Sequence, residues 1–162
     1  MTARPAVPHM MLVDDHPIVR RGVRDILVDA FPCAAIDEVG SGIEALSMAA
    51  ADEWDILILD LTLPDCSGLD VLKGVRERHA RLPVLILSMH MPDQFARRVI
   101  AAGGSGYLTK DAADAELVTA VGRLLRGGRY FNPDVLERVA MTLHPDSAPR
   151  PHERVSDREY QV

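Results

Sequence analysis

Residues 56–64 read ILILDLTLP, in which four apolar residues lead directly into Asp60 and a turn that ends at Pro64. A short, continuous apolar run of this kind is typical of a central strand in a parallel sheet, because helices cover both faces of such a sheet. Two further runs, Met10–Val13 and Val84–Leu87, have the same character. The three runs predict a sheet whose central strands are buried on both sides.

Helical patterns alternate with these apolar runs. Apolar residues recur at the spacing of one helix face in residues 19–30, and similar patterns predict helices at Ile43–Ala51, Leu69–Arg78, Gln94–Ala102 and along residues 117–125. Weaker strand signals at Ala34–Val39 and Gly106–Thr109 are expected at or near the edges of the sheet. The glycine pairs at 103–104 and 127–128 are placed to end the fourth and fifth helices. Five successive βα units predict a doubly wound, five-stranded parallel α/β domain.

The pattern changes after Phe131. Asn132-Pro133 suits the start of a short helix that runs to about Leu143, and the proline-rich residues 144–154 suit a linker. We therefore divide the chain into an α/β domain at residues 9–130, a helix and linker at 131–154, and a new helical start at 155–162.

Composition limits the classes of function. A net charge of −6 argues against nucleic-acid binding by this chain alone, because phosphate neutralisation needs clustered Lys and Arg. No signal-peptide pattern or membrane-spanning apolar run is visible, and Cys33 and Cys66 are expected to be free thiols. The sequence predicts a cytoplasmic protein without membrane contact.

Polar residues follow the predicted strands at the end where ligands bind in doubly wound sheets. The residues in question are Asp14 and Asp15 after the first strand, Asp60 after the third, Ser88 after the fourth and Lys110 after the fifth. Taken singly, each has a purely structural explanation: a helix cap for Asp15, a turn for Asp60, a polar strand end for Ser88 and a solvated charge for Lys110.

Taken together, these residues predict a chemical site. Three carboxylates at one rim repel each other unless a cation is present, and Mg²⁺ prefers such oxygen ligands. Phosphoryl transfer needs a nucleophile, which a carboxylate can be, and positioned positive charge and hydrogen-bond donors, which Lys110 and Ser88 would supply.

Four segments carry a resemblance to a known family: VDDHP at 13–17, DLTLP at 60–64, LS at 87–88 and YLTK at 107–110. Together they resemble the receiver domain of two-component response regulators, over about residues 9–129. The phrases DDHPIVRRG, GYLTKDA and GGRYFNP are similar to the NarL/LuxR-type subfamily. The resemblance implies a flavodoxin-like strand order of 2-1-3-4-5.

The resemblance also implies roles for the acidic residues. Asp60 matches the phosphoacceptor, which takes its phosphoryl group from a sensor histidine kinase. Asp14 and Asp15 match the acidic pair that holds Mg²⁺ together with Asp60 and the backbone carbonyl of Thr62.

Further positions match the residues that respond to phosphorylation. Ser88 and Lys110 match the hydroxyl and the ammonium that contact the phosphoryl group, and Tyr107 matches the aromatic switch residue. Thr62 and His90 occupy positions that tune the phosphate lifetime in related domains.

The resemblance implies an output through dimerisation and DNA. The switch face is expected on the fourth helix, fifth strand and fifth helix, and a homodimer could use that face or the first and fifth helices. Residues 155–162 resemble the opening turn of a LuxR-type helix-turn-helix domain, the rest of which is missing here, so we expect DNA contact only through that missing part.

Three rival interpretations remain. A haloacid-dehalogenase-like phosphatase needs an acid two residues after its nucleophile, where this chain has Thr62. An FMN-binding flavodoxin needs a phosphate loop where this chain has the acidic Asp14-Asp15. A phosphate-independent pseudo-receiver is the main alternative. We expect no turnover enzyme, only self-phosphorylation and autodephosphorylation.

Overall fold

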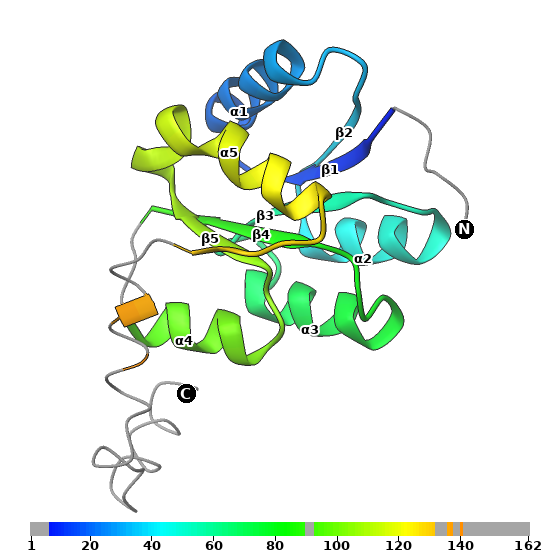
Figure 1. Ribbon diagram of the computed structural model, residues 1–162. Helices are drawn as coiled ribbons and strands as arrows, with labels where there is room; N and C mark the ends of the chain where they lie inside the picture. The colour runs from blue at the N-terminus through cyan, green and yellow to red at the C-terminus, as the bar shows by residue number, and fades with distance from the viewer. Residues whose placement is uncertain (1–6, 90–92, 132–135, 138–139, 141–162) are drawn as a thin grey trace, which may run out of the picture.

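The computed structural model describes residues 7–89, 93–131, 136–137 and 140, which form alternating strands and helices (Figure 1). The strands are β1 (His9–Val13), β2 (Ala35–Val39), β3 (Ile56–Asp60), β4 (Val84–Ser88), β5 (Gly106–Thr109) and β6 (Tyr130–Phe131). The helices are α1 (Pro17–Ala30), α2 (Gly42–Ala51), α3 (Gly68–Arg78), α4 (Asp93–Ala101) and α5 (Ala113–Leu125), with the short 3-10 helix η1 (Lys110–Ala112) before α5.

The segment after Phe131 is described only in part. Residues 136–137 and 140 are helical, and the other residues of the short helix predicted to run from Asn132 to about Leu143 lie outside the described residues. The predicted linker at 144–154 and the predicted helical start at 155–162 lie outside the described residues. Within the described part of the chain, no helix combines the length and the apolar character that crossing a membrane requires.

All strands pair in parallel in one sheet of order β2-β1-β3-β4-β5-β6. The predicted doubly wound topology and the order of the first five strands are confirmed. The predicted number of strands was wrong, because Tyr130 and Phe131 pair with Gly106 and Tyr107 to form a sixth strand. Two residues are too few to produce the periodicity by which a strand is recognised in a sequence.

The core has two layers, one on each face of the sheet. Helices α1 and α5 cover one face, and α2, α3 and α4 cover the other (Figure 1). Every residue of β3 and β4 is buried, as the continuous apolar runs predicted. Both faces of the central strands are thus filled with apolar side chains, and the polar residues gather where the strands end.

Glycines end α4 and α5 as predicted. Gly103 and Gly127 have φ values of 94° and 86°, a left-handed conformation that side chains with a Cβ rarely adopt. The N–H of Gly128 donates to the carbonyl of Arg123 at 2.9 Å, which satisfies one of the last carbonyls of α5. The chain then turns back along β5, which is how β6 joins the sheet.

Two side chains cap the N-terminus of α2. The hydroxyl of Ser41 accepts a hydrogen bond from the N–H of Glu44. Asp65, in the loop after β3, accepts from the N–H groups of Gly42 at 2.9 Å and Ile43 at 2.8 Å. These hydrogen bonds hold the pKa of the Asp65 carboxyl below its usual value. The loop that follows Asp60 is thereby fastened to α2.

We predict that Asp65→Ala lowers the free energy of unfolding at neutral pH, because two N–H groups at the start of α2 lose their acceptor. The pKa of Asp65 is lower in the folded state, so its contribution is present at neutral pH and is lost as the pH falls below about 4. Urea unfolding of both proteins across this pH range should show the difference between them shrinking with acidification. A difference that stays constant with pH would contradict a charged cap.

Candidate functional site

Two buried carboxylates lie side by side at the ends of β1 and β3. The two strands pair with Val13 opposite Leu59, so the next residues, Asp14 and Asp60, reach the same rim of the sheet. Asp14 is only 2% exposed and Asp60 only 3%. The N–H of Asp14 also donates to the carbonyl of Val39 in β2 at 3.0 Å, which fixes the backbone that carries the first carboxylate.

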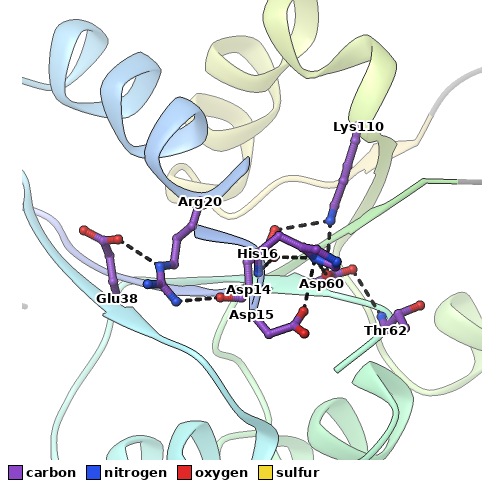
Figure 2. A network of polar contacts seen from close by, with 8 residues as sticks. All are labelled: Asp14, Asp15, His16, Arg20, Glu38, Asp60, Thr62 and Lys110. Carbon is purple, nitrogen blue, oxygen red and sulfur yellow. Dashed lines mark hydrogen bonds and ion pairs between the residues drawn. The ribbon is translucent and has the colours of Figure 1, made fainter. Parts of the chain in front are cut away.

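A buried ammonium group joins these two carboxylates. Lys110 is the first residue of η1, directly after β5. Its Nζ lies 3.2 Å from Oδ2 of Asp14 and 3.1 Å from Oδ2 of Asp60, and the side chain is 8% exposed (Figure 2). Lys110 is therefore not a solvated loop charge but the counter-ion of two buried acids. The peptide bond to Asp111 is trans, like the others in the described residues.

The carboxylate of Asp60 is held by a different donor on each oxygen. Its Oδ1 accepts from the N–H of Thr62 at 3.1 Å, while its Oδ2 faces Lys110. Burial raises the pKa of Asp60 above its usual value, and the charge of Asp14 acts in the same direction. The Thr62 N–H and the Lys110 ammonium oppose this rise. The single positive charge of Lys110 therefore does not fully compensate the negative charge of the buried carboxylates.

The donor set fits a divalent cation. Oxygens of Asp14, Asp15 and Asp60 lie within 4.8 Å of one another, together with a ring nitrogen of His16. The Oδ1 atom of Asp15 is buried and accepts no hydrogen bond from any described residue. Asp15 does not cap α1 either, because the N-cap residue is His16 and that cap has no side-chain hydrogen bond. A buried carboxylate oxygen without a donor suits a hard metal ion.

His16 lies at the centre of the acidic cluster, which the sequence did not reveal. Its Nδ1 atom is 3.2 Å from Oδ1 of Asp14, 3.1 Å from Oδ1 of Asp15 and 3.8 Å from Oδ2 of Asp60 (Figure 2). Its backbone N–H donates to Oδ1 of Asp14 at 2.8 Å. The only sequence signal of this placement is that His16 directly follows the acidic pair.

Arg20 supports the loop from the outside and was also missed. One guanidinium nitrogen donates to the backbone carbonyl of Asp14 at 2.8 Å, and another donates to the carboxylate of Glu38 in β2 at 3.0 Å (Figure 2). Arg20 thus ties α1 and β2 to the residue that carries the first carboxylate. A helix residue six positions after Asp14 gives no sequence signal of such a contact.

Two of the remaining predicted residues, Ser88 and Tyr107, lie on β4 and β5. Ser88 is 6% exposed and Tyr107 is fully buried. The Tyr107 hydroxyl is hydrogen-bonded to Ser88; burial raises the pKa of Tyr107, and this bond partly offsets the rise. Thr62 has an exposed side chain, and His90 lies outside the described residues. Asp14, Asp15, Asp60 and Lys110 therefore come together, with Ser88 and Tyr107 on the neighbouring strands.

Comparisons with known proteins agree on one family. A family model described as response regulator receiver domain matches residues 10–122. The response regulator UvrY of Escherichia coli K12 is 30% identical over 155 residues, which cover 95% of this chain and 71% of that protein. The transcriptional activator protein ExaE of Pseudomonas putida is 35% identical over 136 residues, covering 84% of this chain and 64% of that protein.

A solved structure shows the same likeness in three dimensions. A two-component response regulator of the LuxR family from Aurantimonas sp. SI85-9A1 superimposes with a TM-score of 0.76 at 37% sequence identity. The match covers 85% of this chain and 98% of that one. The likeness thus covers nearly the whole of that receiver-like chain at the level of the fold.

The charge balance of the site predicts two variants with opposite effects. Asp60→Asn should raise the free energy of unfolding by on the order of 1 kcal/mol, because it removes one charge from a crowded, buried acidic cluster. Lys110→Met should lower it by about 3–5 kcal/mol, because two buried carboxylates lose their counter-ion. Urea unfolding without divalent ions measures both, with Asp25→Asn on exposed α1 surface as the control. Equal effects of the two variants would contradict this balance.

Proposed function

The chain belongs to the response regulator receiver family of two-component systems, in its NarL/LuxR-type branch, and on that premise we propose that Asp60 accepts a phosphoryl group from a sensor histidine kinase. The finding that carries the proposal is a set of ion pairs. Asp14, Asp60 and Lys110 lie at the ends of three different strands, and the Lys110 ammonium contacts both carboxylates.

Asp60 is suited to act as the nucleophile. Its carboxylate is buried but held at both oxygens, by the N–H of Thr62 and the ammonium of Lys110, which fixes its direction. In the transfer, an Asp60 oxygen forms the new O–P bond while the P–N bond to the donor imidazole breaks. The bonding pair returns to that nitrogen, and because the other ring nitrogen of the donor carries a proton, the leaving group is a neutral imidazole.

Lys110 and Ser88 are suited to hold the transferred group. The Lys110 ammonium already lies 3.1 Å from Oδ2 of Asp60, so it is within reach of a phosphoryl oxygen attached there. Ser88 ends β4 beside Asp60, since Asp60 pairs with its neighbour Leu87. Positive charge and a hydroxyl donor are the main protein contributions that phosphoryl transfer requires.

Mg²⁺ would be held by Asp14, Asp15, Asp60 and the backbone carbonyl of Thr62. When bound, it supplies the positive charge that neutralises the phosphoryl oxygens and the acidic cluster. Oδ1 of Asp15 is buried without a hydrogen bond, and the pKa of Asp60 is raised mainly by burial. Both features support this assignment, because a cation would stabilise these carboxylates.

Ser88 and Tyr107 are proposed to transmit the change. A phosphoryl group adds negative charge at the rim, and a shift of the Ser88 hydroxyl towards it would alter the hydrogen bond that Ser88 shares with Tyr107. The ring of Tyr107 is fully buried between the sheet and its helices, so a change in its position alters packing there. Thr62 and His90 remain proposed tuners of the phosphate lifetime.

The proposed effect of phosphorylation, control of transcription, is based on the relatives. ExaE is named a transcriptional activator, and this chain is proposed to act likewise through a helix-turn-helix domain that begins at residues 155–162. A cytoplasmic location and a homodimer after phosphorylation belong to the same proposal. The dimer would use either α4, β5 and α5 or α1 and α5.

The rival classes fit the site less well. A haloacid-dehalogenase-like phosphatase needs a second acid two positions after its nucleophile. In this chain that position is Thr62, whose N–H donates a hydrogen bond to Asp60. A pseudo-receiver does not require an ammonium buried against two acids, as Lys110 is here.

Incubation with acetyl phosphate and Mg²⁺, followed by intact mass measurement, tests the phosphoacceptor. Wild type should gain one phosphate and Asp60→Asn none, because an amide cannot form the acyl phosphate. Hydroxylamine should remove the phosphate, since it cleaves acyl phosphates but not a phosphoester on serine.

Asp25→Asn, on the exposed face of α1, serves as the control and should gain phosphate like wild type. Phosphate on Asp60→Asn, or none on wild type, would contradict the proposal. Continuous hydrolysis of a phosphomonoester would favour the phosphatase instead.

A further inference from the structure

We propose that His16 is an additional metal ligand, which makes this site select first-row transition ions such as Ni²⁺ and Zn²⁺ over Mg²⁺. The inference rests on the metal site of the proposed function and adds to it a residue that determines which ion is bound. It concerns the imidazole ring that lies among the three carboxylates (Figure 2).

The distances suit ligands of one ion. Adjacent ligands of an octahedral ion with bonds of about 2.1 Å lie about 3.0 Å apart. In a tetrahedral zinc site with similar bonds the separation is about 3.4 Å. Nδ1 of His16 lies 3.2 Å from the nearest Asp14 oxygen and 3.1 Å from that of Asp15, and 3.8 Å from Asp60. The nitrogen and the Asp14 and Asp15 oxygens are thus spaced as ligands of one ion, while the Asp60 oxygen lies farther away. Without an ion, Nδ1 and Oδ1 of Asp14 are hydrogen-bonded to each other at this distance.

The backbone holds His16 in this position. It is the N-cap residue of α1 in an extended conformation, with φ −95° and ψ 105°, and the following Pro17 disfavours other conformations. Its N–H donates to Oδ1 of Asp14 at 2.8 Å. The loop between the second acid and α1 is therefore short, restrained and directed at the site.

The position of the ring also allows access from solvent. The side chain of His16 is 57% exposed, whereas Asp14 and Asp60 are buried behind it. An entering ion would meet the imidazole and the partly exposed Asp15 before it reached the buried acids. Lys110 lies against Oδ2 of Asp14 and Oδ2 of Asp60, and the latter is also the Asp60 oxygen nearest to His16. Oδ1 of Asp14 and Oδ1 of Asp15 remain on the side of His16.

The chemistry of imidazole as a ligand explains why this arrangement would distinguish transition ions from Mg²⁺. Mg²⁺ binds oxygen and gains little from imidazole, whereas Ni²⁺ and Zn²⁺ bind imidazole well. A site of carboxylates alone would favour transition ions only by their general affinity order. A site with His16 adds a nitrogen bond that Mg²⁺ does not use, so removal of the imidazole should affect the two kinds of ion differently.

Isothermal titration of the whole chain with NiCl₂ and, separately, with MgCl₂ tests the proposal. His16→Gln should lose at least about tenfold in Ni²⁺ affinity, since even outer-shell partners of a metal are worth that much. Its Mg²⁺ affinity should stay unchanged. Pulsed electron paramagnetic resonance of bound Mn²⁺ should show coupling to a ligand nitrogen in wild type and none in His16→Gln.

Two further variants separate the outcomes. His79→Gln changes a histidine whose Nε2 lies 2.8 Å from the carbonyl of Ala49, away from the acidic cluster, and should keep the Ni²⁺ affinity of wild type. Asp15→Asn should weaken both ions. If Asp15→Asn weakens both ions but His16→Gln weakens neither, or both equally, this inference fails and the proposed Mg²⁺ site stands. If Asp15→Asn weakens neither, the metal site of the proposed function fails as well.

Discussion

The ion pairs between Lys110 and the buried acids Asp14 and Asp60 are the constraint on which the site depends. Burying charge is costly unless it is paired, and here one ammonium serves two carboxylates that are almost inaccessible to water. The remaining negative charge makes the site suited to a cation. Because the three groups lie at the ends of β1, β3 and β5, they meet only when these strands are assembled in one sheet.

The parallel sheet makes this meeting reproducible. β1 and β3 are neighbours in the order β2-β1-β3-β4-β5-β6, and their register brings Asp14 and Asp60 to one rim. On the other side of β3, the strands place Ser88 opposite Thr109, directly before Lys110. Tyr107 then links the rim to the end of the domain, because it is hydrogen-bonded to Ser88 and pairs along its backbone with Phe131. A change at the rim thus has a continuous set of contacts to β6.

Much of this arrangement could be predicted from the sequence, because strand ends are visible as apolar runs that stop at a polar residue. Asp14, Asp60 and Lys110 each follow such a run, and topology brings them together. β6 could not be predicted, since two residues carry no periodicity. The position of the His16 ring could not be predicted either, because it depends on side-chain torsions in a loop. The Asp65 cap on α2 joins residues 23 and 22 positions apart and likewise has no local signal.

The most direct test of the central claim is ¹⁹F nuclear magnetic resonance of the protein with beryllofluoride, which mimics a phosphoryl group on a carboxylate. Protein-bound fluorine signals should appear only when Mg²⁺ is present and should be absent from Asp60→Asn. Bound signals in Asp60→Asn, or signals in wild type that persist without Mg²⁺, would contradict a cation-dependent phosphoacceptor at Asp60.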